Sequence, residues 1–371
     1  MTAGESELRE LRASVREFME AKSSEDAVRK LMESEPRFDP AVWAQAADQL
    51  RLPGLAIPEE YGGDGFGPVE LGVVLEEMGR ALLCSPFFAT VVLAAQALLA
   101  SGDSEACARH LPGIAEGRIT ATLAVAEDSG SWDPALVSTR ALPDGDGGWR
   151  LRGRKSFVID GTTADLILVV ARTVAGPTLF AVDREAAGLT AEPLETLDAT
   201  RAMARLTFDA VPATPVGADG AGGRIMAKVL DIASVGLAAE QAGGARRCLE
   251  ASAEYARVRH QFGRPIGTFQ AVKHKCADML VQVELAEAAS REAARLAAEG
   301  AAEFPVAAAV AHACCSRAYM FAAMENIQVH GGIGFTWEHP AHLYFRRAKS
   351  SQLLFGGPAV YHERLLDRLG I

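Results

Sequence analysis

The feature that most constrains the fold is the spacing of apolar residues, because this spacing changes twice along the chain. Near the N-terminus apolar residues recur at helical intervals, as at Leu8, Leu11 and Val15, with charged residues between them. From about residue 118 the pattern becomes that of short strands separated by Pro, Asp and Gly turns. After Gly217 the helical spacing returns and continues to the C-terminus. The sequence therefore predicts helical, β and helical regions in that order.

The predicted β region holds several segments typical of strands. Thr120–Val125 and Leu166–Val170 are short, apolar and rich in β-branched residues, whereas Trp149–Ile159 alternates apolar and charged residues. We expect a mainly α-helical fold with a β-domain insert. The expected domains are an N-terminal helical domain at 1–117, a middle β-domain at 118–217 and a C-terminal helical bundle at 218–371.

Charge and metal-ligand residues exclude several classes of protein. The net charge of −11 and the pI of about 5.3 argue against a nucleic-acid backbone as partner. The six cysteines form no Cys-x-x-Cys pair, and His330, His342 and His362 lack metal spacing, so we expect free thiols and no metal site. The charged N-terminus is unlike a signal peptide, and no stretch approaches the roughly 20 apolar residues of a membrane span. We expect a cytoplasmic protein that binds neither nucleic acid nor membrane.

Two glycine clusters have to be weighed against a dinucleotide-binding fold. Gly62–Gly67 and Gly331–Gly334 are rich in glycine, but neither has the Gly-x-Gly-x-x-Gly spacing between a strand and a helix. The sequence therefore does not predict a Rossmann domain.

A set of short phrases in a fixed order is more specific. Each phrase alone is weak evidence, whereas the ordered set spans nearly the whole chain. Together they resemble the acyl-CoA dehydrogenase family, which implies two helical domains around a β-barrel-like domain. The phrases are Pro58–Gly63, Glu76–Arg80, Gly153–Gly161, Leu197–Arg201 with Val211 and Pro212, Tyr255–Gly263 with Phe269 and Gln270, and Gln328–Phe335.

The resemblance also implies a cofactor and a reaction, which are FAD and the α,β-desaturation of an acyl-CoA thioester. In that chemistry a carboxylate removes the α-proton while the β-hydride leaves toward the flavin from the opposite face. An electron-transfer flavoprotein is the electron acceptor that the resemblance implies. Family members bind FAD across a subunit boundary, so we expect a dimer or tetramer.

One group of residues matches the family's contacts with the pyrophosphate and adenine of the neighbouring subunit's FAD. Arg259 would supply a rigid charged fork for phosphate, and Gly331 and Gly332 would allow close backbone approach. The alternative is that Arg259 is an ordinary surface arginine at a helix end. The residues of this group are Arg259, Phe262, Gln270, Gln328, Gly331 and Gly332.

A second group matches the positions that hold the flavin ring of the chain's own site, and here the resemblance decays. Family hydroxyl groups are replaced at Ala126, Trp132 and Ile159, and Trp132 adds a bulky indole. These losses predict a poor flavin pocket in this chain. The residues matching the flavin-ring positions are Val125, Ala126, Phe157 and Val158.

Both positions at which the family places its catalytic base are apolar. The commoner position falls on Phe355, and the second falls on Ala233, which Ser234 follows. Neither Phe nor Ala has a proton-accepting side chain. Glu240, two turns beyond Ala233, is the candidate for a relocated base, and Asp231 is a candidate substrate contact. The alternative for both acids is a structural or solvated role.

Two interpretations of function remain open. In the first, the chain is a non-catalytic partner that completes the FAD site of a sister subunit. Its ending Leu354–Pro358 resembles the base-less subunits of two-gene actinobacterial acyl-CoA dehydrogenases. In the second, it is a self-sufficient homo-oligomeric enzyme with a relocated base such as Glu240. The neighbour-facing group is intact while the flavin-ring group has decayed, and this asymmetry favours the first.

Overall fold

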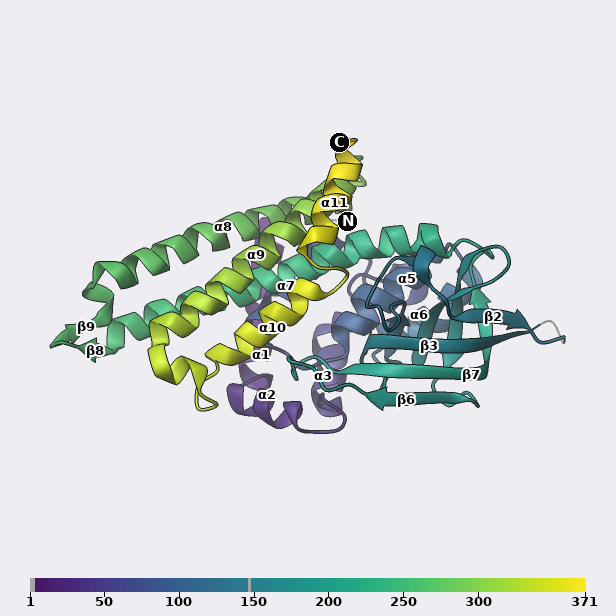
Figure 1. Ribbon diagram of the computed structural model, residues 1–371, viewed down its shortest axis with the longest axis horizontal. Helices are drawn as coiled ribbons and strands as arrows, with labels where there is room; N and C mark the ends of the chain where they lie inside the picture. The colour runs from purple at the N-terminus through teal and green to yellow at the C-terminus, as the bar shows by residue number, and fades with distance from the viewer. Residues whose placement is uncertain (1–3, 146–147) are drawn as a thin grey trace. The chain divides into compact units, whose positions relative to one another are not determined.

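A computed structural model describes residues 4–145 and 148–371 of the chain (Figure 1). The helical, β, helical order is confirmed, and so is the mainly α-helical fold with a β insert. Helices precede Ala115, strands β1 to β7 run between Ala121 and Val216, and helices dominate again from Gly222. The limits near residues 117 and 217, as boundaries of domains, stay a prediction.

Local sequence explains where the N-terminal helices start. The carboxylate of Asp39 accepts a hydrogen bond from the Ala41 N–H at 2.8 Å, and that of Asp103 accepts one from the Ala106 N–H at 3.0 Å, so each caps the helix that follows. Arg51 ends one of these helices with a left-handed backbone. The helices are α1 (Glu5–Lys22), α2 (Glu25–Met32), α3 (Pro40–Leu50), α4 (Pro68–Arg80), the π-helix Phe88–Ala95, α5 (Gln96–Ser101) and α6 (Ser104–Ala115).

The chain forms two compact units. Residues 31–67 and 84–233 make one unit, which holds β1 to β7. Among the described residues, the other unit contains 4–30, 68–83 and 234–371, and it is helical apart from a short hairpin. The 37-residue helix α7 (Gly222–Val258) contributes residues to both units.

Five strands of the first unit close into a ring. Each of β4, β2, β3, β7 and β5 pairs with the next, and β5 pairs back to β4, so these strands leave no open sheet edge among themselves. β1 adds to β4 in parallel, and β6 adds to β7. The strands are β1 (Ala121–Ala124), β2 (Arg140–Pro143), β3 (Trp149–Ile159), β4 (Leu166–Arg172), β5 (Pro177–Asp183), β6 (Leu189–Pro193) and β7 (Met203–Val216).

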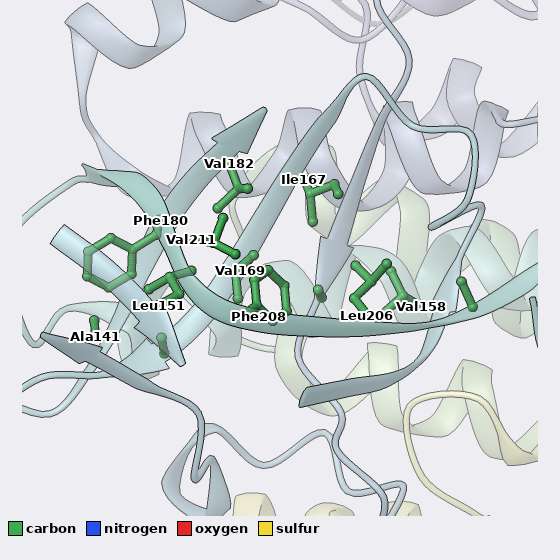
Figure 2. Packing of buried hydrophobic residues seen from close by; sticks show 13 residues of the cluster. Ala141, Leu151, Val158, Ile167, Val169, Phe180, Val182, Leu206, Phe208 and Val211 are labelled. Atoms are coloured by element: carbon green, nitrogen blue, oxygen red, sulfur yellow. The ribbon is translucent and has the colours of Figure 1, made fainter. Parts of the chain in front are cut away.

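Apolar side chains from facing strands fill this ring. Leu151 from β3, Phe180 from β5 and Leu206 from β7 belong to one cluster of side chains that are almost fully buried (Figure 2). The strands contribute alternate residues to the cluster because successive side chains of a strand point to opposite faces. The resemblance to a β-barrel-like domain is therefore confirmed by the packing.

The second unit is a bundle of long helices. α8 (Gln270–Glu299) and α9 (Phe304–His330) lie side by side in opposite directions, joined by a short turn at Gly300 (Figure 1). A hairpin of β8 (His260–Gln261) and β9 (Arg264–Pro265) links α7 to α8. The chain ends with α10 (Ala341–Leu353) and α11 (Pro358–Leu369).

Two glycines allow α4 and α7 to touch backbone to backbone. A Cβ atom on Gly79 would lie 2.0 Å from the Glu240 carbonyl oxygen, and one on Gly243 would lie 1.8 Å from the Glu76 carbonyl oxygen. Arg12 on α1 adds ion pairs to Glu76 at 2.6 Å and to Glu77 at 3.0 Å. Close packing and paired charges thus fix α1 and α4 on the bundle.

The expectation that no segment approaches a membrane span is wrong for one helix. Phe304–Phe335 is long and apolar enough to cross a membrane by length and composition, with a mean hydropathy of 1.3 in its most apolar window. Of that window, 56% is buried inside the protein. A core helix of a soluble protein passes the same test, as its Ala-rich packing against α8 illustrates.

Candidate functional site

The first predicted phosphate-contacting segment lies where α7 runs into the β8–β9 hairpin. The Arg259 backbone N–H donates to the Tyr255 carbonyl at 2.9 Å, which continues the helical pattern by one residue. Phe262 occupies the hairpin tip with φ +55 and is 92% exposed. Gly263 follows with φ +77, a conformation that glycine adopts without strain.

The second predicted segment ends α9. Gln328 is exposed in the last turn, and Gly331 leaves the helix with φ +67. A Cβ atom placed on Gly331 or Gly332 would meet nothing within 4 Å, so the backbone of this turn is open to an approaching group. Tyr255 on α7 and His330 on α9 connect the two segments, since their ring centroids are 4.3 Å apart.

We call Arg259, Phe262, Gln270, Gln328, Gly331 and Gly332 the cofactor-facing surface, and all six are exposed. Within residues 4–145 and 148–371, no hydrogen bond or ion pair engages the side chains of Arg259, Gln270 or Gln328. An unengaged guanidinium, two amides and an open glycine turn suit the phosphates of a dinucleotide. These residues therefore fit the far end of an FAD molecule.

The positions matched to the flavin ring lie in the first unit. Val125, Ala126 and Val158 are each no more than 2% exposed, whereas Phe157 is 38% exposed with φ +58. The pairing of β3 with β7 shifts register beside Phe157, and the bulge turns this ring outward. Ile159 is one of the positions matched to a hydroxyl group of the family. Its side chain is 2% exposed and offers no hydrogen-bonding atom.

A buried ion pair anchors the first of these segments, and the sequence analysis did not single it out. The Lys155 ammonium group is fully buried and donates to the Val125 carbonyl at 2.8 Å and to Glu127 at 3.1 Å. Burial lowers the pKa of Lys155 to about 8 despite this carboxylate. Burial opposes ionisation of Glu127, but hydrogen bonds from Ser138 and Thr139 and the charge of Lys155 lower its pKa to about 2. These contacts fix the backbone at Val125 and the side chain of Glu127.

The two base positions lie in apolar surroundings. Ala233 is fully buried on α7, and Phe355 is 1% exposed just after α10. Phe355 has φ +64, in the left-handed region that a bulky residue rarely adopts. The hydroxyl of Ser234, which follows Ala233, lies 3.4 Å from the Tyr361 hydroxyl.

Glu240, the candidate for a relocated base, is engaged in the core of the helical unit. Its carboxylate accepts a hydrogen bond from the Arg347 guanidinium on α10 at 3.0 Å, and the two side chains are 6% and 4% exposed. The carboxylate oxygen that would accept a substrate proton is already engaged by the guanidinium. Asp231, the candidate substrate contact, is 7% exposed on α7. The geometry therefore supports a structural role for Glu240.

Helical regions before and after a closed β-ring in the chain, together with exposed residues suited to phosphate, match the class of flavin-dependent acyl-thioester oxidoreductases. Comparison with known families agrees. Models of the acyl-CoA dehydrogenase N-terminal, middle and C-terminal domains match residues 5–118, 122–211 and 220–370. The chain belongs to the acyl-CoA dehydrogenase family, and this membership implies FAD as cofactor.

Individual relatives cover almost the full length of the chain. The chain is 36% identical over 355 residues to the acyl-CoA dehydrogenase IpdE2 of Mycobacterium tuberculosis, covering 96% of this chain and 95% of that protein. A variant of the Tcur3481-Tcur3483 steroid ACAD is 37% identical, with a TM-score of 0.89 and 98% coverage of both chains. The ChsE4-ChsE5 complex from Mycobacterium tuberculosis is 30% identical, with a TM-score of 0.90 over 99% of this chain and 98% of that chain.

Proposed function

We propose that this chain is the non-catalytic subunit of a two-subunit acyl-CoA dehydrogenase, in which its cofactor-facing surface completes the FAD site of a catalytic sister chain. One observation carries the proposal: Phe355 and Ala233 occupy both family base positions, and Arg347 already binds the nearby acid Glu240. Desaturation requires a carboxylate within hydrogen-bond reach of the α-carbon. This chain offers none at the positions where the family places it.

The chain's own residues would act by holding and orienting the cofactor. Bound FAD supplies the hydride acceptor of the reaction. Arg259 would neutralise phosphate charge, Gln270 and Gln328 would donate amide hydrogen bonds, and the turn at Gly331 would admit the cofactor's backbone. The sister chain would supply the base and the flavin-ring pocket, so that each pair of chains has one active site.

Relatives support this architecture and suggest a substrate class. The solved structures Tcur3481-Tcur3483 and ChsE4-ChsE5 carry paired names, and the first is titled a steroid ACAD. We therefore propose an acyl-CoA thioester with a steroid-derived acyl group as substrate and an electron-transfer flavoprotein as acceptor. A dimer or tetramer with the sister chain is the proposed assembly.

The test compares the purified chain alone with the chain co-expressed with its sister. Turnover is measured on a panel of acyl-CoA thioesters with an artificial electron acceptor. Since a positioned general base contributes roughly 10²–10⁴ in rate, we expect turnover by the complex and at least about a hundredfold less by the lone chain. Comparable turnover by the lone chain contradicts the proposal and leaves the self-sufficient enzyme with a relocated base.

A further inference from the structure

Three rings from separate parts of the helical unit lie in contact, tilted by 32° and 43°, beside the cofactor-facing surface. The ring centroids of Tyr255 and His330 are 4.3 Å apart, and those of His330 and His339 are 4.2 Å apart. His339 also accepts a hydrogen bond at Nδ1 from the Ala341 N–H, at 3.2 Å, where α10 begins. We call Tyr255, His330 and His339 the imidazole stack. It connects the ends of α7 and α9 with the start of α10.

The stack lies directly next to both segments of the cofactor-facing surface. On one side, the Arg259 N–H donates to the carbonyl of Tyr255 at 2.9 Å. On the other side, His330 immediately precedes Gly331, and its Nδ1 lies 2.8 Å from the Asn326 carbonyl. The contact between Tyr255 and His330 thus joins the helix end that leads to Arg259 to the helix end that leads to the glycine turn.

Burial disfavours the protonated form of these histidines. Burial lowers the pKa of His330 and of His339, and it lowers the pKa of neighbouring His342 to about 4. In the described parts of the chain no group of three His, Cys, Asp or Glu side chains could hold a metal ion, so the cluster is not a metal site. Charged side chains from several helices act on the histidines or line a cavity of about 440 Å³ beside His339. They are Glu25 and Arg29 from α2, Arg346 from α10, Arg247 and Glu254 from α7, and Glu20 from α1.

Three further charged groups line the same cavity and are already paired. Arg16 meets Glu77 at 2.8 Å, and Arg80 meets Glu250 at 2.5 Å. The other charged groups near the stack are of both signs, and Arg29 among the cations meets Glu25 at 2.7 Å. They give no large excess of negative charge that would favour two protonated imidazoles.

We propose that the imidazole stack positions the cofactor-facing surface, and that protonation of His330 and His339 weakens its hold on FAD. The inference rests on the proposed function of that surface. Two imidazolium ions with centroids 4.2 Å apart repel each other, and the repulsion is relieved when the rings separate. Separation moves the Gly331 turn away from Arg259, and a bound dinucleotide loses contacts at one of its ends.

The direction of the pH effect follows from the histidine pKa values. They are lower in the folded protein than the ordinary value of about 6.5, so the unfolded or separated form binds more protons below that pH. The ordered stack is therefore fully stable above about pH 6.5 and loses stability as the pH falls below it.

The test measures FAD binding by the co-expressed complex from about pH 7.5 to about pH 5, together with the urea midpoint for unfolding. In the wild type we expect the Kd for FAD to rise by up to about tenfold per pH unit for each linked proton below about pH 6.5. His330→Phe keeps a ring between Tyr255 and His339 but cannot be protonated. We expect its Kd near pH 7.5 to stay within about threefold of wild type and to rise less at low pH. His330→Ala removes the ring, so its Kd should rise at every pH.

Two controls separate the possible failures. His362→Gln changes an exposed histidine on α11 and should keep the wild-type pH profile. If His330→Phe also keeps the wild-type profile, the imidazole stack is not the element that responds to pH. If Arg259→Ala retains FAD near pH 7.5, the proposed function fails instead. The unfolding midpoints show whether a variant lost FAD because it lost its fold.

Discussion

Replacing Glu240 by Gln tests whether this acid is a structural ion or a relocated catalytic base. The change removes the carboxylate that Arg347 meets at 3.0 Å, where the two side chains are 6% and 4% exposed. Breaking a buried ion pair by removing one partner costs about 3–5 kcal/mol, because the remaining charge loses its counter-ion in a low-dielectric interior. We therefore expect the free energy of unfolding of Glu240→Gln to fall by about 3–5 kcal/mol.

The assay is urea unfolding of the chain followed by circular dichroism, with a matched control. Glu284→Gln removes an exposed carboxylate that pairs with Arg246 at 2.6 Å, and its side chain is 59% exposed. Its cost should stay below about 1 kcal/mol. The double change Glu240→Leu with Arg347→Met should recover much of the loss, since apolar groups of similar volume can replace a buried pair. The structural interpretation would be refuted if the wild-type chain proved active and Glu240→Gln abolished that activity while remaining as stable as the control variant.

Three further predictions test other parts of the structure. The co-expressed complex should carry about one FAD per two chains, and Arg259→Ala should release it, whereas Ile159→Ala should change flavin content little; absorbance of the dialysed complex measures both. Stability should fall as the pH drops from about 4.5 to about 2, because the folded pKa of Glu127 is lowered to about 2 and the unfolded chain binds more protons in that interval. Glu127→Gln should flatten this acid limb in urea titrations at each pH. Gly243→Ala should destabilise the chain by about 1–3 kcal/mol in the same unfolding assay, because the added Cβ would lie 1.8 Å from the Glu76 carbonyl oxygen; a neutral effect would contradict the close helix packing.

The sequence predicted local structure well because that information lies within a few residues. Asp39 and Asp103 stand where a cap is needed, and the caps form with residues two and three positions ahead. The spacing of apolar residues separated helical from β regions for the same reason. The membrane expectation failed at Phe304–Phe335 because this helix is apolar enough over a long window, and only the packed structure shows that 56% of that window is buried.

The sequence alone determined which side chains are present at the family's base and hydroxyl positions. Phe355 and Ala233 lack a proton acceptor whatever the fold around them. The set of short sequence phrases in a fixed order also determined the family, since this order is a property of the whole chain rather than of one short segment.

Only the tertiary structure decided what the remaining polar groups do. Glu240 and Arg347 are 107 residues apart in the chain, and their pairing supports a structural role for the candidate base. The contact between Tyr255 and His330 likewise depends on how α7 and α9 pack. Ionisation and positioning depend on which charges and rings come within a few ångströms of each other, and long-range packing sets those distances.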